Sequence, residues 1–430
     1  MQDAAICFAE DNEGPSANFY GRLAANVGLL QAWARYGGGD VLRCVTPSPN
    51  EAQKLLQLLH NAGLDQRPLV RVSSFARSLP AENIGVLFRL DPNLTDMIWA
   101  RRVEGTERKF SICGLTHTLS PNAVIEWMSN LTVAPAQSWD ALVCTSRAAQ
   151  SMITDLFEQW REYLGDRLGA VRRCPIQLPV IPLGVDTAAY APDPVVRAAM
   201  RQRLGLEADD VALLFMGRLS YYEKAHPAPM FIAAEMAQKQ IKSGRRLRLL
   251  LLGRFPEAGD EALYRNCAAA LAPSIPLSVL DGADPEIYAG ARAAADVFLS
   301  LSDNVQETFG LTPVEAMAAG LPAVVTDWDG YRDTVDDGVV GVRVPTVMAP
   351  AGGDGGIGSY HYQSRDYYRF LGRLSQRTAA DVQAAATALA GLADNPDRRR
   401  AMGEAGRERA RRLYDWSVVV AQYEALWAEL

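Results

Sequence analysis

The sequence contains few cysteines and histidines, no long apolar run and no excess of basic over acidic residues. Its 430 residues include 6 Cys and 4 His, and these form neither a C-x-x-C pair nor a metal-ligand spacing. We therefore expect reduced, mostly buried thiols and no metal site. No uninterrupted apolar run approaches the ~18 residues that a membrane-spanning helix needs.

The charge balance argues against a nucleic-acid-binding protein. The chain carries 43 Lys and Arg against 50 Asp and Glu, which gives a formal net charge of -7. A net acidic chain repels phosphates except where a local basic site overrides the repulsion. The composition therefore leaves room for a small cationic site but not for a cationic face.

The beginning of the sequence resembles a first strand more than a targeting signal. It has no basic segment before its short apolar run, and that run stops at Glu10. We therefore expect a soluble, cytoplasmic protein. The segment 397–414 is rich in Arg, for which a solvated helix face is the first interpretation. Peripheral contact with anionic lipid on the inner membrane face is the alternative.

Short apolar runs rich in Val, Ile, Leu and Phe alternate with longer amphipathic stretches along nearly the whole chain. This alternation predicts βα units and a largely parallel sheet. The predicted strands are 5–9, 41–45, 69–72, 84–88 and 141–144 in the first half, and 211–216, 247–252, 277–280, 297–301 and 323–326 in the second. The fold class is therefore α/β, with two doubly wound Rossmann-like domains.

A proline-rich stretch, 178–194, has the composition of a connection between domains. We expect an N-terminal domain over 1–190 and a C-terminal domain over 191–413, with a last helix at about 414–430 that packs back on the first domain. Ligands of open α/β sheets bind beyond the carboxyl ends of the strands. Two such domains are expected to face each other across a cleft, and function should be sought where their strands end.

The block 297–320 carries the most chemical information. It predicts a strand, a polar loop with Glu307 and Gly310, and a helix that contains Pro313 in its first turn, then Glu315, and stops at Gly320. Such a helix start directs backbone N–H groups and the positive end of the helix dipole at a ligand, which suits a phosphate. The two carboxylates can accept hydrogen bonds from sugar hydroxyls.

Two cations follow another predicted strand. Arg218 comes two residues after the predicted strand 211–216, and Lys224 follows six residues later. Placed at a strand end, the two side chains can neutralise a diphosphate through charge-assisted hydrogen bonds.

At these residues the chain resembles glycosyltransferase family 4, the retaining enzymes of the GT-B fold. The resemblance rests on the run 307–322, on Gly217-Arg218-Leu219 and on Lys224, with supporting matches at 140–146, 180–186 and 395–417. It covers roughly the last two thirds of the chain through specific motifs. The first third matches only through its βα pattern.

The resemblance implies a role for each matching residue. Arg218 and Lys224 would hold the diphosphate of the donor, Glu315 the ribose hydroxyls of its nucleotide, and Glu307 the hydroxyls of the transferred sugar. His117, which follows a first-domain strand, would act near the donor sugar as a catalytic residue together with Arg218, Lys224 and Glu307.

Further donor contacts are implied around these residues. The backbone N–H groups of Phe309, Gly310 and Leu311 would lie close to the sugar and phosphates, with Thr312 beside them. Gly282 belongs to a segment that would form a wall of the nucleotide pocket. In the glycine loop of the first domain, Gly14 alone matches the family.

Two features stay outside the resemblance. The Gly-rich segment 351–358 is interpreted as a surface loop, with a substrate-contacting lid as the alternative. The triplet Asp327-Trp328-Asp329 has the D-x-D form that binds a metal in another glycosyltransferase fold. Its place after the strand 323–326 favours a loop, so the implied enzyme needs no metal and no other cofactor.

The implied function is transfer of a sugar from a nucleotide diphosphate sugar to a carbohydrate or lipid-linked acceptor, with retained anomeric configuration, in glycan, polysaccharide or glycolipid synthesis. A nucleotide-sugar epimerase, a phosphorylase and a catalytically silent nucleotide-binding paralogue are the alternatives. A dinucleotide oxidoreductase is disfavoured, because no G-x-G-x-x-G follows the first predicted strand.

Overall fold

The computed structural model describes residues 4–8, 21–38, 41–62, 69–74, 84–170, 172–349 and 367–430. The chain divides into two compact units, with unit 1 formed by Met1–Gly184 and Asp415–Leu430 and unit 2 by Val185–Tyr414. Gly14 and the segment 351–358 lie outside the described residues, so their predicted roles stay predictions.

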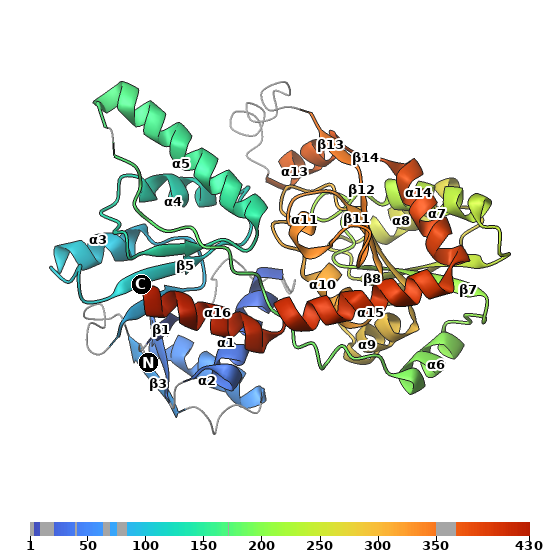
Figure 1. Cartoon of the computed structure of the whole chain (residues 1–430), viewed down its shortest axis with the longest axis horizontal. Coiled ribbons are helices and arrows are strands. Elements are labelled where there is room, and N and C mark those ends of the chain that lie inside the picture. Colours follow the sequence, from blue (N-terminus) through green and yellow to red (C-terminus); the bar gives the residue numbers. More distant parts are fainter. Residues whose placement is uncertain are drawn as a thin grey trace. The chain divides into compact units, whose positions relative to one another are not determined.

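Unit 1 alternates strands and helices before the chain leaves it, and regains one helix at the C-terminus (Figure 1). Its elements are β1 (Ala4–Cys7), α1 (Gly21–Tyr36), β2 (Val41–Thr46), α2 (Pro49–Asn61), β3 (Leu69–Ser74), β4 (Val86–Arg89), α3 (Thr95–Val103), β5 (Ser111–Leu115), α4 (Asn122–Leu131), β6 (Ala141–Val143), α5 (Arg147–Leu168) and α16 (Trp416–Glu429). The six strands form one parallel sheet in the order β3-β2-β1-β4-β5-β6.

Helix α16 packs on unit 1 through aromatic side chains. The ring of Trp427 stacks on Trp33 of α1 with centroids 3.7 Å apart, and it lies 5.2 Å from the ring of Phe88 in β4. The Ser111 hydroxyl donates to the backbone carbonyl of Leu430 at 2.8 Å. These contacts join the last helix of the chain to the first half of the sequence.

Unit 2 repeats the same plan. Its elements are α6 (Pro194–Arg203), β7 (Asp210–Met216), α7 (Pro227–Gln240), β8 (Arg246–Gly253), α8 (Asp260–Leu271), β9 (Leu277–Asp281), α9 (Pro285–Ala294), β10 (Val297–Ser300), α10 (Leu311–Ala318), β11 (Ala323–Thr326), α11 (Tyr331–Thr334), β12 (Gly341–Val344), β13 (Thr346–Met348), α13 (Tyr367–Ser375), β14 (Thr378–Ala380), α14 (Val382–Asp394) and α15 (Pro396–Leu413). Six parallel strands lie in the order β12-β11-β10-β7-β8-β9, which is the order of unit 1 again. Strands β13 and β14 form a separate antiparallel pair.

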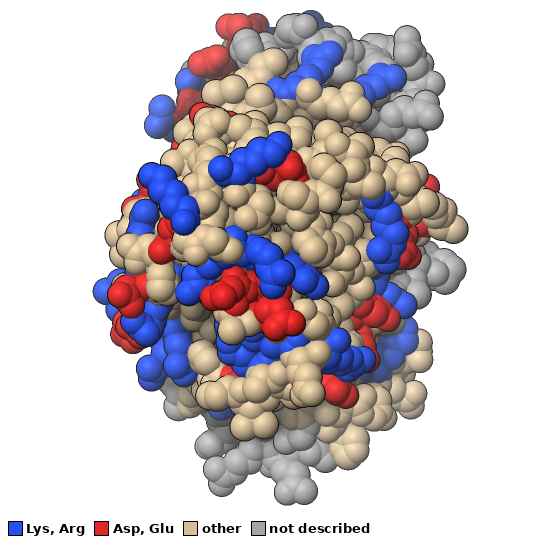
Figure 2. All heavy atoms as spheres, turned by 90° about the vertical axis from the view of Figure 1, so that its right-hand side faces the viewer, with Lys and Arg blue, Asp and Glu red and all other residues tan. Residues whose placement is uncertain are grey.

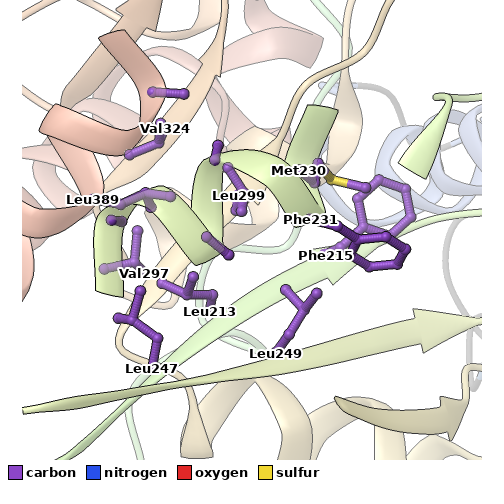
Figure 3. Close-up of a cluster of buried hydrophobic side chains, with 14 of the residues drawn as sticks. Leu213, Phe215, Met230, Phe231, Leu247, Leu249, Val297, Leu299, Val324 and Leu389 are labelled. Carbon is purple, nitrogen blue, oxygen red and sulfur yellow. The ribbon is translucent and has the colours of Figure 1, made fainter. Parts of the chain in front are cut away.

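Strands β7, β10 and β11 of the unit 2 sheet are buried along their whole length, which explains their apolar sequences. All seven residues of β7 are buried. Leu213 and Phe215 of β7 pack with Leu249 of β8 and Phe231 of α7 in one cluster, which Leu389 of α14 joins (Figure 3). The predicted pair of doubly wound α/β sheets is therefore confirmed.

The cysteines are free thiols, but only half of them are buried, fewer than expected. All six are free thiols, of which Cys44, Cys113 and Cys144 are buried. Burial raises the pKa of the Cys113 thiol to about 12, so this thiol stays protonated at neutral pH.

Neither the surface charge on the face in Figure 2 nor the described helices indicate an extended charged surface or a membrane span. On the face that Figure 2 shows, Lys and Arg side chains are interspersed with Asp and Glu and form no broad area of one sign. Among the helices that the structure describes, none is long and apolar enough to cross a membrane.

Candidate active site

The predicted site residues of unit 2 lie on loops and a helix start at the carboxyl edge of its sheet. Strands β7 and β10 are neighbours and parallel, so the loops that follow them leave the same edge side by side. The first loop carries Arg218 and Lys224, and the second carries Glu307. This is the edge at which open α/β sheets bind their ligands.

Three glycines allow the backbones at this edge to approach closely. Gly217 follows β7 with a φ of 146°, Gly253 ends β8, and Gly282 follows β9. A Cβ on Gly253 would overlap the carbonyl oxygen of Gly217, and a Cβ on Gly282 would lie 3.0 Å from the Cα of Gly253. The amide of Gly282 donates to the Gly253 carbonyl at 3.2 Å. Glycine at these positions thus leaves room for backbone packing beside the site.

Lys224 and Glu307 meet directly. The Lys224 ammonium forms an ion pair with the Glu307 carboxylate, and both side chains are largely buried, with 15% and 10% of their surfaces exposed. The Ser302 hydroxyl donates to the Lys224 carbonyl at 3.1 Å and lies 3.5 Å from Glu307 Oε2. The amide of Gly330 donates to the Glu307 carbonyl at 3.0 Å. The structure therefore brings two of the predicted catalytic side chains together, from loops 83 residues apart.

Arg218 lies in the same loop as Lys224 and has its own carboxylate. Its guanidinium forms an ion pair with Glu223, whose side chain is 8% exposed while that of Arg218 is 27% exposed. Burial raises the pKa of Glu223, although Arg218 opposes the shift. Both predicted diphosphate-binding cations are thus paired with protein carboxylates, and an anionic ligand would have to share or replace these partners.

Glu315 lies in α10, and two tyrosines from other parts of unit 2 bind its carboxylate. The hydroxyl of Tyr190 donates to Oε1 at 3.1 Å and that of Tyr288 to Oε2 at 2.7 Å. Burial raises the pKa of Glu315, while the tyrosine hydroxyls, Arg292 and Lys224 act in the opposite direction. The effect of Lys224 links Glu315 electrostatically to the Lys224–Glu307 pair.

The start of α10 has the geometry that an anion site requires. Gly310 precedes the helix with a φ of 88°, and a Cβ there would overlap the ring of Tyr331. Leu311 and Thr312 form the first turn, where backbone N–H groups have no acceptor within the helix. The side chain of Phe309 is 3% exposed and packs against the ring of Tyr414, so a ligand would meet the backbone of Phe309.

The Asp327-Trp328-Asp329 triplet forms a loop beside Glu307. Asp327 forms ion pairs with Arg332 and Arg343, each at 3.3 Å. Burial and the nearby Glu307 carboxylate raise the pKa of Asp329 to about 7. Within the described ranges, no group of three or more His, Cys, Asp or Glu side chains is placed to hold a metal ion.

His117 belongs to unit 1. It follows β5, is 8% exposed, and its Nε2 lies 3.0 Å from the carbonyl oxygen of Leu90. A buried strand-end histidine with a backbone partner fits both a structural and a catalytic role. Its catalytic role stays a prediction.

Sequence reasoning did not identify four residues around the site: Glu223, Tyr190, Tyr288 and Arg292. Tyr288 and Arg292 stand four apart on α9 and therefore share a helix face, a signal that the sequence contains. Tyr190 lies 125 residues before Glu315, and no local pattern links the two.

Comparison with known proteins finds relatives of the segment that carries this site. Residues 196–350, which include β7 to β12 and all the site residues of α9, α10 and their loops, match the family Glycosyl transferases group 1. A D-inositol 3-phosphate glycosyltransferase of Kineococcus radiotolerans is 35% identical over 196 residues, 44% of this chain and 43% of the relative. The chain thus spans less than half of the length of such relatives.

Two further similarities extend over more of the chain. A phosphatidyl-myo-inositol mannosyltransferase of Mycobacterium leprae is 27% identical over 365 residues, 82% of each chain. The crystal structure of Anabaena HepE in complex with UDP matches all of both chains with a TM-score of 0.62 at 15% identity. At this identity the structural likeness shows the fold, which is GT-B.

Proposed function

We propose that the chain, whose residues 196–350 match the family Glycosyl transferases group 1, transfers a sugar from a nucleoside diphosphate sugar to an acceptor hydroxyl, with retention of the anomeric configuration. The observation that carries the proposal is the Lys224–Glu307 pair at the carboxyl edge of the unit 2 sheet. It places a cation for phosphate next to a carboxylate for sugar hydroxyls, with the start of α10 four residues beyond Glu307.

Binding of the diphosphate would change the partners of both cations. Arg218 and Lys224 are held by Glu223 and Glu307. A diphosphate that reached them would take over part of these ion pairs, which leaves Glu307 able to accept hydrogen bonds from the sugar. The N–H groups at the start of α10 add further donors without a metal.

In the reaction, the bond between the anomeric carbon and the β-phosphate oxygen breaks while the acceptor oxygen bonds to the same carbon on the same face. The acceptor proton passes to the leaving phosphate oxygen. Arg218, Lys224 and the α10 N-terminus stabilise the charge that develops on this phosphate. His117 of unit 1 is assigned to the neighbourhood of the donor sugar on the family resemblance.

The relatives indicate which donor and acceptor classes to test first. HepE was crystallised with UDP and with UDP-glucose, which makes a uridine diphosphate sugar the first donor to test. The named relatives act on inositol phosphate or on phosphatidyl-myo-inositol, which makes a polyol phosphate or its lipid-linked form the first acceptor class. We assign donor binding to unit 2 and acceptor binding to unit 1.

A peripheral membrane site on α15 receives limited support. Two of its arginines serve internal contacts: Arg399 donates to the Leu392 carbonyl at 2.5 Å, and Arg409 to the Asp333 carbonyl at 2.9 Å. Arg400 is paired with Asp397 of the same helix. Contact with lipid would have to rest on the remaining exposed arginines.

We expect one nucleoside diphosphate among UDP, GDP and ADP to stabilise the protein in a thermal-shift assay. A ligand at 100 times its dissociation constant adds ~2.7 kcal/mol to the stability of the state that binds it. The Lys224→Ala variant should lose most of the shift, because the diphosphate loses a cation, whereas Lys239→Ala, on an exposed side chain of α7, should keep it. Equal shifts in the two variants, or none in the wild type, would contradict the proposal.

Product analysis separates transfer from its rivals. A glycosyltransferase releases free nucleotide in step with a glycosylated acceptor. An epimerase gives a new nucleotide sugar without acceptor, a phosphorylase requires inorganic phosphate, and a silent paralogue binds nucleotide with no turnover.

A further inference from the structure

The carboxylate of Glu315 is held by the two hydroxyls of Tyr190 and Tyr288, which we call the tyrosine pair. Tyr288 lies on α9, and Tyr190 lies in the turn before α6, so neither belongs to the helix that carries Glu315. Each carboxylate oxygen accepts one hydroxyl, at 3.1 Å for Oε1 and 2.7 Å for Oε2. The two hydrogen bonds together fix the orientation of the carboxylate, because each oxygen is held by one hydroxyl.

Arg292 keeps the two rings in place. Its guanidinium carbon lies 4.1 Å from the ring centroid of Tyr190 and 4.8 Å from that of Tyr288. Its Nε donates to the Tyr288 carbonyl at 3.2 Å, and the residue is 9% exposed. Stacking of a buried guanidinium on both rings restricts their rotation, so the hydroxyls are aimed by packing as well as by the hydrogen bonds.

The hydrogen-bond acceptor positions of Glu315 that the tyrosine pair does not use match a ligand with two neighbouring hydroxyls. An ionised carboxylate offers about four lone-pair positions, two on each oxygen. The tyrosine pair uses one on each, which leaves one acceptor position per oxygen. Two neighbouring hydroxyls, as on a ribose, can occupy these positions together, and a lone hydroxyl uses only one of them.

We propose that Tyr190 and Tyr288, fixed by Arg292, are positioning residues that set Glu315 to receive both hydroxyls of a nucleotide ribose. This inference rests on the proposed function, in which Glu315 binds the ribose. It extends that function by making the preference for a ribonucleotide depend on residues outside the Gly310–Gly320 segment.

The test compares ribose and deoxyribose ligands. Isothermal titration would measure the affinities of UDP and 2′-deoxy-UDP for the wild type, Tyr288→Phe and Tyr190→Phe, with the GDP or ADP pair used instead if that base binds. Tyr288→Phe removes a hydrogen bond to the charged carboxylate of Glu315. The affinity for the ribonucleotide should therefore fall about 10-fold or more. The deoxynucleotide should be weakened much less, so the variant loses most of the preference for ribose.

The pH dependence gives a readout that a structural role would not move. The charged and titratable groups that face Glu315 are Tyr190, Tyr288, Arg292 and Lys224, and they favour its carboxylate form against burial. Loss of the Tyr288 hydroxyl should raise the pKa of Glu315, so its carboxylate should become protonated at a higher pH. In a titration toward acid, the variant should therefore lose nucleotide affinity at a higher pH than the wild type does. Titration of the phosphate is common to both proteins and cancels in the comparison.

Tyr264→Phe is the matched control, since its buried hydroxyl donates to the Ala225 carbonyl at 3.5 Å and lies outside the tyrosine pair. It should keep the wild-type preference for ribose. If Tyr288→Phe does not fold, Tyr190→Phe carries the same prediction through Oε1. A wild type that prefers the ribonucleotide while both tyrosine variants keep the same preference and pH profile overturns the inference alone. A wild type that binds none of the nucleotides overturns the proposed function as well.

Discussion

Arg218→Ala should lower kcat by a factor on the order of 10² or more, because the leaving diphosphate loses a fixed cation in the transition state. Arg218 extends from the end of β7 at the carboxyl edge of the sheet and is only partly exposed. The substitution also leaves Glu223 buried without this cation, so the pKa of Glu223, which burial already raises, should rise further. Steady-state kinetics on the variant would measure the effect once a donor and an acceptor are known.

Arg265→Ala provides the comparison. Arg265 lies on α8 of the same unit and forms an exposed ion pair with Glu261 at 2.7 Å, a type of pair that contributes little to stability. It should keep wild-type turnover. Unchanged kcat in Arg218→Ala, with the control behaving as expected, would remove Arg218 from the reaction.

The second large effect concerns folding of unit 1. Arg101 and Asp140 are both fully buried and form a bidentate ion pair, with N–O distances of 2.7 and 2.5 Å. Asp140 also accepts the amides of Ile112 and Gln137, each at 2.8 Å. Asp140→Ala should lower the free energy of unfolding by ~3–5 kcal/mol, because the Arg101 guanidinium is left buried without its counter-charge.

Urea unfolding followed by tryptophan fluorescence would measure this loss. Trp328 is the one tryptophan of unit 2 and the other seven belong to unit 1, so the signal reports mainly on the unit that changes. Asp155→Ala, on an exposed position of α5, should stay within about 0.5 kcal/mol of the wild type. A loss of less than 1 kcal/mol in Asp140→Ala would show that the pair contributes little.

Periodicity was enough to predict the architecture of both units. The predicted strand 211–216 corresponds to β7 (Asp210–Met216), because a strand buried on both faces needs an uninterrupted apolar run. The predicted strand 277–280 corresponds to β9 (Leu277–Asp281), which lies at the edge of the sheet and is only partly buried. The block 297–320 folds as predicted, with β10, a loop, and α10 followed by Gly320 at a φ of 79°. Proline fixes the backbone in the first turn of α10, and glycine permits the left-handed conformation that ends the helix, so local sequence determines both ends.

Contacts between distant segments were harder to predict. The approach of Lys224 to Glu307 depends on β7 and β10 being neighbours, which follows from the strand order and not from either loop. The bond from Tyr190 to Glu315 and the pair of Arg101 with Asp140 likewise join segments that no spacing rule connects. Such contacts become visible only when the packing of the elements is known.

A crystal structure of the protein with the nucleoside diphosphate that gives the largest thermal shift tests the central claim most directly. The diphosphate should lie within hydrogen-bonding distance of Arg218 and Lys224, and the ribose hydroxyls should bind the carboxylate of Glu315. A nucleotide bound away from the carboxyl edge of the unit 2 sheet, or with its ribose remote from Glu315, would contradict that claim.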